Sequence, residues 1–262
     1  MGVAVEMRPA LGGPGTAVII TGGASGIGLA SAQALAAVGR AVALWDIDAA
    51  KAAAAATSIE ADFGVAAHAV AIDLRDLAAY APALAETRSA LGPIGGLVHS
   101  AGIVDTGSLD GVTPESWADG IDTHLRPLIL LVQALMPDFR ASPGSAVVAI
   151  ASINATLGNA VNPIYSAAKG GMLSLVRSLA DRLAQDRIRI NSVSPGVIRT
   201  PMVQAAVEHL PKGHFERRIL LERLGEAAEI GRMVRFLLSD EASYVTAAEF
   251  VVDGGNISSQ RQ

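Results

Sequence analysis

The sequence contains no cysteine among its 262 residues. This absence excludes disulfide bonds, thiolate metal sites and cysteine nucleophiles together. Aromatic residues are also scarce, at 4% of the chain, whereas hydrophobic residues make up 51%. So apolar a chain is not disordered, and its core must consist of alanine, valine, isoleucine and leucine, which allow helices to pack closely on a sheet.

Charged residues are sparse as well, at 17% of the chain. The 20 basic and 25 acidic residues give a net charge of −5 and form no run of one sign. This distribution argues against nucleic acid as the main partner. No histidine or carboxylate residues stand at metal-ligand spacing, so we expect a small-molecule substrate and no metal.

A stretch without any charge lies between Arg8 and Arg40 and could suggest a membrane span. A spanning helix needs about 20 consecutive apolar residues. Here Thr16–Thr21 predicts a short buried strand and Gly26–Val38 a helix. Glycine and proline interrupt the rest, at Gly12, Gly13, Pro14, Gly15, Gly22, Gly23, Gly26 and Gly28. The chain also opens without a secretory signal, so we expect a soluble cytoplasmic protein with no membrane contact.

Short apolar runs rich in β-branched residues alternate with longer segments rich in alanine and leucine. Continuous apolar strands separated by helices indicate a parallel sheet that is covered on both faces. Right-handed crossovers then give an α/β protein with a three-layer, doubly wound Rossmann fold. The seven predicted strands are Ala17–Ile20, Ala41–Leu44, Ala66–Ile72, Ile94–His99, Ala146–Ile150, Ile188–Val193 and Glu249–Val252.

The spacing of these strands leaves room for one helix between neighbours, so residues 16–262 are predicted to form a single domain. Residues 1–15 are rich in glycine and proline, and we expect them to be flexible. Residues 195–224 form a long connection after the carboxyl end of a strand. Long connections in compact domains are usually functional, and open α/β sheets bind ligands at this edge.

A glycine-rich segment, Thr21–Gly28, joins the first strand to the first helix. Glycines at such a junction permit a tight turn and let the main chain approach a pyrophosphate, while the helix N-terminus attracts the phosphates. This placement favours a dinucleotide site over a plain turn. No Gly-Lys-Ser/Thr sequence follows, which excludes a P-loop nucleoside triphosphatase.

An aspartate, Asp46, ends the second predicted strand. An acid about 20 residues beyond the glycines is placed to accept hydrogen bonds from the adenosine ribose hydroxyls. It would repel a 2′-phosphate, and no basic residue in the glycine-rich segment offsets that repulsion, so we expect NAD rather than NADP. The alternative role for Asp46 is a helix N-cap, but Asp48 is better placed for that role and leaves Asp46 free.

Tyr165 and Lys169 stand four residues apart just inside a predicted helix, which places them on one face. An ammonium beside a phenol lowers the pKa of the phenol and makes it a usable proton donor or acceptor. Tyr-x-x-x-Lys alone is more often a surface pair. Ser152 follows a predicted strand directly, where a hydroxyl can bond a substrate oxygen as charge develops on it.

Together these motifs resemble the classical type of the short-chain dehydrogenase/reductase family, from about residue 16 to residue 256. The resemblance implies that Ser152, Tyr165 and Lys169 are catalytic, that Tyr165 and Lys169 also bind the cofactor, and that residues 195–224 form a substrate lid. It also implies a homotetramer or homodimer. The other implied NAD-binding residues are Gly22, Ser25, Gly26, Ile27, Gly28, Asp46, Ile47, Asp73, Leu74, Ser100, Ala101, Gly102, Pro195, Gly196, Ile198 and Thr200. Val252–Gly255 resembles the family's C-terminal signature.

Two positions depart from the family pattern. His99–Gly102 reads His-Ser-Ala-Gly where the family has Asn-Asn-Ala-Gly, so two bracing amides are missing. His124 replaces an asparagine that holds a water linking the catalytic lysine to solvent. Either His124 takes over this proton relay as a catalytic residue, since imidazole both donates and accepts, or it is a packed histidine. A third possibility, loss of activity, conflicts with the intact catalytic residues.

The resemblance and the residue chemistry predict hydride transfer between a nicotinamide and a secondary alcohol or ketone, with Tyr165 as acid or base. One alternative is a 3-oxoacyl thioester reductase, which typically uses NADP. Another is a non-catalytic, dinucleotide-sensing protein. The apolar residues expected in the lid are Met202, Val203, Ala206, Val207, Leu210, Phe215, Ile219 and Leu220, as a pocket roof or as ordinary packing. Asn154, Leu157 and Asn159 are also expected to line the pocket, but they do not identify the alcohol.

Overall fold

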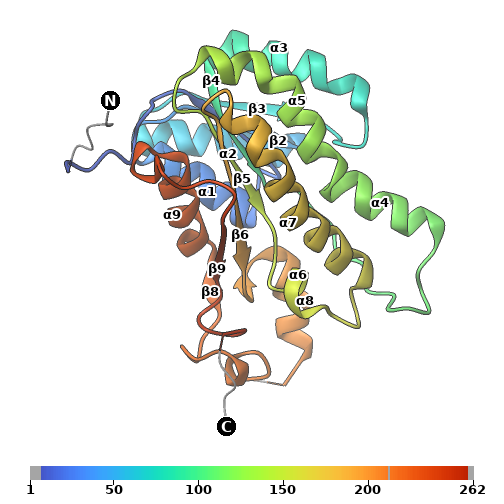
Figure 1. Ribbon diagram of the computed structural model, residues 1–262. Coiled ribbons are helices and arrows are strands. Elements are labelled where there is room, and N and C mark those ends of the chain that lie inside the picture. Colours follow the sequence, from blue (N-terminus) through green and yellow to red (C-terminus); the bar gives the residue numbers. More distant parts are fainter. Residues whose placement is uncertain (1–6, 212, 259–262) are drawn as a thin grey trace.

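The computed structural model describes residues 7–211 and 213–258, and for residues 205–207 the main chain only. Seven strands form one parallel sheet in the order β3-β2-β1-β4-β5-β6-β9 (Figure 1), which confirms the predicted fold class. These strands are β1 (Ala17–Thr21), β2 (Val42–Asp46), β3 (Ala67–Ala71), β4 (Ile94–His99), β5 (Ala146–Ile150), β6 (Arg189–Pro195) and β9 (Glu249–Val252).

Helices cover both faces of the sheet (Figure 1). One face carries α1 (Gly26–Ala36), α2 (Ala49–Phe63) and α9 (Ala227–Leu238). The other carries α3 (Tyr80–Leu91), α5 (Arg126–Ala141) and α7 (Pro163–Ala184), and α4 (Pro114–His124) packs against α5 and α7. These helices complete the three predicted layers.

The core consists of two apolar clusters, one on each side of the sheet. In β1, Val18 and Ile20 belong to the cluster beneath α1 and α9, whereas Ile19 belongs to the opposite cluster, as strand geometry requires. Small residues bring the helices close together. A Cβ atom on Gly231 of α9 would lie 2.4 Å from the carbonyl oxygen of Ala30 in α1, so only glycine permits this contact.

The strand order reverses at β1, which pairs with β2 on one side and β4 on the other. Ligands of open α/β sheets bind at such a switch point, outside the carboxyl ends of the strands. The loops that leave these ends contain α6 (Asn154–Leu157), β7 (Ile198–Arg199), α8 (Pro201–His209) and β8 (Gly225–Glu226), and β7 pairs with β8. Three short 3₁₀ turns complete the described elements: Leu77–Ala79, Glu216–Arg218 and Asp240–Ala242.

The carboxyl ends of β2 and β6 carry residues of the predicted site. β2 ends at Asp46, as predicted, and Trp45 and Asp46 remain in register with β3. β6 extends beyond its predicted end to Pro195, which pairs with Val252 of β9. Both Asp46 and Pro195 are therefore held in the sheet by pairing with a neighbouring strand.

The uncharged stretch between Arg8 and Arg40 includes β1 and α1. Across residues 7–211 and 213–258, no helix combines the length and apolar character needed to cross a membrane. Within the N-terminal segment, the N–H of Ala10 donates to the Glu241 carboxylate at 2.8 Å. Residues 1–6 lie outside the described residues, and flexibility of the segment stays a prediction.

Candidate active site

The loop between β1 and α1 is shaped by missing side chains. Gly22 has φ of 65°, and a Cβ there would lie 2.8 Å from the Cα of Ala101. A Cβ on Gly28 would lie 2.0 Å from the carbonyl oxygen of Gly22. Ser25 precedes α1 and makes no capping bond within the described chain, which leaves the first N–H groups of α1 for another acceptor. This cradle fits a phosphate group.

Asp46 braces the same loop. Its Oδ2 accepts from the N–H of Ala24 at 3.0 Å, and its Oδ1 accepts from the N–H of Asp48 at 3.1 Å. Asp48 is the N-cap of α2, as predicted, and accepts from the N–H of Lys51 at 3.0 Å. Asp46 is therefore not the cap of α2, as predicted, although two main-chain N–H groups donate to its carboxylate. Each carboxylate oxygen can accept a second bond, so a ribose contact remains compatible with this brace.

Arg75, which no motif in the sequence indicated, lines the pocket beside Asp73. Its guanidinium lies 2.8 Å from the Asp73 carboxylate and 3.0 Å from the Asp119 carboxylate. The hydrogen bonds from Arg75 hold the pKa of Asp73 below its ordinary value. Two carboxylates therefore offset the positive charge at this end of the pocket.

Tyr165 and Lys169 both line the pocket from α7. Lys169 is 3% exposed, which excludes the surface-pair alternative. Its Nζ donates to the carbonyl oxygen of Ile150 at 2.6 Å and lies 5.5 Å from the centre of the Tyr165 ring. Burial lowers the pKa of Lys169 to about 7. The ammonium can therefore lose its proton near neutral pH.

Burial raises the pKa of the Tyr165 phenol, and a hydrogen bond with Ser152 opposes that rise. This differs from the sequence expectation that Lys169 lowers the pKa of Tyr165. The reason is that burial of the phenol, which disfavours its charged form, is the largest influence on its pKa. Ser152 is buried just after β5, and its Oγ also accepts from the N–H of Asn154 at 3.1 Å. Ser152 is therefore the polar neighbour that favours the phenolate.

His124 is buried at the end of α4. Its Nε2 lies 2.7 Å from the carbonyl oxygen and 3.1 Å from the nitrogen of Ile103, and its ring meets the Tyr165 ring edge-on at 5.4 Å. Among the described residues Nδ1 has no hydrogen-bond partner. Burial, and next the charge of Lys169, lower the pKa of His124 to about 3. A neutral imidazole with one unpartnered nitrogen is compatible with both the relay and the packed alternative.

His99 supplies a brace that the sequence analysis missed. Its Nδ1 lies 2.9 Å from the Thr21 hydroxyl and its Nε2 lies 2.8 Å from the His124 carbonyl oxygen. Thr21 Oγ1 accepts from the N–H groups of Ser100 and Ala101, so its hydrogen points to Nδ1, and Nε2–H donates to His124. Burial lowers the pKa of His99 to about 4. A neutral histidine thus ties β1, β4 and α4 together.

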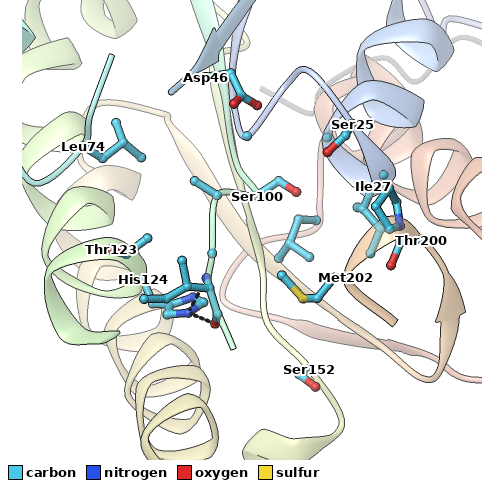
Figure 2. A pocket seen from close by; sticks show the side chains of 18 of the residues that line it. Ser25, Ile27, Asp46, Leu74, Ser100, Thr123, His124, Ser152, Thr200 and Met202 are labelled. Atoms are coloured by element: carbon cyan, nitrogen blue, oxygen red, sulfur yellow. Dashed lines mark hydrogen bonds between the residues drawn. The ribbon is translucent and has the colours of Figure 1, made fainter. Parts of the chain in front are cut away.

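Every residue predicted for the catalytic and cofactor sites lines one pocket of about 410 Å³ at the carboxyl edge of the sheet. Figure 2 shows Asp46 and Ser25 at one end, and His124 and Ser152 at the other. This volume is ordinary for a small-molecule site. In the part of the chain that the structure describes, no group of three or more histidine or carboxylate side chains could hold a metal ion.

Comparison with known proteins identifies the family. A family model described as enoyl-(acyl carrier protein) reductase matches residues 22–256. A protein from Rhizobium meliloti (strain 1021), described as probable galactose dehydrogenase GalD, is 35% identical and covers 91% of this chain and 93% of its own length. The chain belongs to the short-chain dehydrogenase/reductase family.

Other members of the short-chain dehydrogenase/reductase family support this assignment. The 3-oxoacyl-(acyl-carrier-protein) reductase FabG of Escherichia coli (strain K12) is 33% identical over 92% of this chain and 97% of its own. The structure of L-sorbose reductase from Gluconobacter frateurii, complexed with NADPH and L-sorbose, superposes with a TM-score of 0.89 at 28% identity, covering 95% and 99% of the two chains. As a member of this family, the protein is an oxidoreductase of hydroxyl or keto groups that uses a nicotinamide dinucleotide.

The substrate side of this short-chain dehydrogenase/reductase differs from the prediction. Met202 and Val203 of α8 line the pocket, and the side chains of Ala206 and Val207 lie outside the described residues. Within the described chain, the following predicted residues do not line it: Asn154, Leu157, Asn159, Leu210, Phe215, Ile219 and Leu220.

Local contacts explain why some of these residues lie elsewhere. Asn159 Oδ1 accepts from the N–H of Val161 at 2.9 Å, Leu157 is 59% exposed, and Ile219 packs at Gly254. Ile103 and Thr123, which the sequence analysis did not name for the site, line the pocket instead. The sequence feature that could have predicted a place for Thr123 in the pocket was its position next to His124.

Proposed function

We propose that this protein is an NAD-dependent oxidoreductase that interconverts a secondary alcohol and a ketone, with Tyr165 as the acid or base. The observation that carries the proposal is a single pocket that joins Ser152, Tyr165 and Lys169 to the glycine loop of α1. When bound there, the dinucleotide supplies the chemistry of hydride acceptance or donation. The residues of the chain supply binding, orientation and proton transfer.

In the oxidation direction, Tyr165 accepts the hydroxyl proton of the substrate. Ser152 bonds the same substrate oxygen as charge develops on it, and its hydrogen bond with Tyr165 favours the phenolate. Lys169 would hold the nicotinamide ribose of a bound cofactor, and its pKa of about 7 lets it exchange a proton near neutral pH. In the reduction direction the same groups act in reverse.

Three carboxylates and one isoleucine support the preference for NAD. Asp46 faces the glycine loop, and Ile47 beside it is 68% exposed and lines the pocket. A 2′-phosphate here would meet the Asp46 carboxylate. Among the described lining residues, the cation at this end is Arg75, and Asp73 and Asp119 already hold it.

A second candidate is reduction of a 3-oxoacyl thioester, because one relative is described as a 3-oxoacyl-(acyl-carrier-protein) reductase. Asp46 argues against it, since such reductases typically use NADP. A non-catalytic, dinucleotide-sensing role is less consistent with the buried, intact catalytic residues. From the family resemblance we also propose a cytoplasmic homotetramer or homodimer.

Purified protein with NAD or NADP and a panel of secondary alcohols tests the proposal. The panel contains sugars, hydroxy acids, hydroxysteroids and 3-hydroxyacyl thioesters, and the signal is the absorbance of the reduced nicotinamide. We expect turnover with NAD on at least one alcohol, and none with the Tyr165→Phe variant. Dinucleotide binding without turnover on any alcohol would instead favour the sensing role.

A further inference from the structure

The catalytic helix α7 begins without a cap of its own. In the described chain, Asn162 at its N-cap position makes no side-chain capping bond, and Pro163 has no N–H. The next two N–H groups donate to one carboxylate in the loop after β4. Ile164 donates to Oδ2 of Asp105 at 3.3 Å, and Tyr165 donates to Oδ1 at 2.9 Å.

Further hydrogen bonds join the same two loops. The side-chain amide of Asn162 donates to the carbonyl oxygen of Asp105. Ser108 donates from its N–H to the Val161 carbonyl at 3.2 Å, and from its hydroxyl to the Ala160 carbonyl at 2.8 Å. We name this set of contacts, made by Asp105 and Ser108 with residues 160–165, the 105–108 clasp.

The loop that carries the clasp also holds His124. The main chain of Ile103 lies within hydrogen-bond distance of His124 Nε2, at 2.7 Å from the oxygen and 3.1 Å from the nitrogen. His124 in turn contacts the Tyr165 ring edge-on. One short segment, residues 103–105, therefore contacts Tyr165 in two ways. Asp105 accepts a hydrogen bond from the main chain of Tyr165, and Ile103 contacts His124, which packs against the Tyr165 ring.

A carboxylate at this place has two physical advantages. It satisfies donors that every helix N-terminus leaves without intrahelical partners, and its charge is favourable at the positive end of the helix dipole. Tyr165 is the third residue of α7, so a bond to its own N–H fixes the main chain that carries the phenol.

We propose that Asp105 is a positioning residue for the reaction: its carboxylate fixes the start of α7 so that the Tyr165 phenol meets Ser152 and the substrate oxygen. This inference rests on the proposed role of Tyr165 as acid or base. Asp105 does not transfer the proton. It acts through the main chain of Tyr165, and small misplacements of a reacting group cost large factors in rate.

Two substitutions at position 105 test this role. Asp105→Ala removes both acceptors, and we expect kcat to fall by about 10-fold to 100-fold. Asp105→Asn retains one acceptor oxygen, which can still bond the Tyr165 N–H, so we expect a smaller fall. The dissociation constant for NAD should stay unchanged in both, because Asp105 is not among the residues that line the described pocket. Falling kcat with unchanged NAD affinity separates positioning from general destabilisation.

A matched control keeps the effect on stability apart from the effect on rate. Asp138 accepts two hydrogen bonds from Arg88, both at 2.8 Å, and does not line the described pocket. Asp138→Asn should lower Tm and leave kcat unchanged. Ser108→Ala removes one bond of the clasp and leaves the two bonds to α7 in place, so its kcat should stay close to that of the unmodified protein.

The outcomes distinguish this inference from the proposed function. Wild-type kcat in Asp105→Ala, alongside an inactive Tyr165→Phe, overturns the positioning role. A parallel loss of kcat and NAD affinity at position 105 also overturns it, because that result indicates a structural role only. If Asp105→Ala does not fold, Asp105→Asn decides by the same criteria. An active Tyr165→Phe variant overturns the proposed function instead.

Discussion

The two ends of the pocket use different chemical groups. At the dinucleotide end the working groups are main-chain atoms, and Gly22 and Gly28 act by having no side chain. At the catalytic end the working groups are titratable side chains whose pKa values are displaced by burial, lowered for Lys169 and raised for Tyr165. The glycine loop therefore depends on shape and the catalytic end on charge, so substitutions in these two regions should fail in different ways.

The largest expected effect lies at the catalytic end. Tyr165→Phe removes the transferable proton without changing the shape of the ring, and general acid–base catalysis is typically worth about 10²–10⁴-fold. We expect kcat to fall by at least this factor while NAD affinity, measured by titration, stays near normal. Near-native turnover would assign the proton transfer to another group.

A change of charge at the dinucleotide end should alter the choice of cofactor rather than the chemistry. Asp46→Ala combined with Ile47→Arg removes a repulsive carboxylate and adds a cation where a 2′-phosphate would lie. Unfavourable charge pairs cost several kcal/mol, so we expect the NAD-to-NADP ratio of kcat/KM to fall by about 100-fold.

Two further measurements complete the cofactor test. Ile47→Arg alone is the matched control, because it leaves the brace from Asp46 to Ala24 in place. Equal kcat/KM for the two cofactors in the unmodified protein would contradict the proposed preference.

The two ends also differ in how far the sequence predicts them. The dinucleotide end depends on a local pattern, Thr21–Gly28, followed by Asp46 at the end of the next strand. The residues of this pattern predicted to bind the cofactor line the pocket: Gly22, Ser25, Gly26, Ile27, Gly28 and Asp46. Strands such as β1 and β5 were predictable for the same reason, since each is a short run of mainly apolar residues. Residues that are close in sequence are placed by the local secondary structure, so the sequence pattern predicts where they lie.

Contacts between distant segments were not predictable in this way. Asp105 and Tyr165 are 60 residues apart, and Arg75 and Asp119 are 44 apart, so no local pattern joins them. The direction of the Tyr165 pKa shift was also not predictable from the sequence, because it depends on how deeply the phenol is buried. In the lid, helical spacing identified Met202 and Val203 but did not exclude Ile219, which is buried elsewhere.

A smaller effect should appear in the pH profile of Ser152→Ala. Oxidation requires Tyr165 as a base, so the rate rises as pH increases through the pKa of the phenol. The Ser152 hydrogen bond lowers that pKa. Its removal should therefore shift the ascending limb of the kcat–pH profile to higher pH, in addition to any loss in maximal rate. An unshifted limb would show that Ser152 acts on the substrate oxygen alone.

The smallest expected effect concerns His124, and it tests the proposed relay. A histidine with an ordinary pKa of about 6.5 would add a step to the pH profile. Burial lowers the pKa of His124 to about 3, so the imidazole stays neutral and we expect no such step above pH 5. A relay through His124 must then be detected as a change in kcat on substitution rather than as a step in the pH profile.

Three variants separate the relay from packing. A relay needs a group that donates and accepts beside Tyr165, and Nδ1 of His124 is buried with no partner in the described chain. His124→Asn keeps both functions and should retain kcat, whereas His124→Ala should lower kcat by less than Tyr165→Phe does. His99→Asn is the control, because it disturbs the brace to the His124 carbonyl and leaves the His124 ring in place. If His124→Ala matches the unmodified protein in kcat, His124 is a packing residue and the proton leaves Lys169 by a route that does not include it.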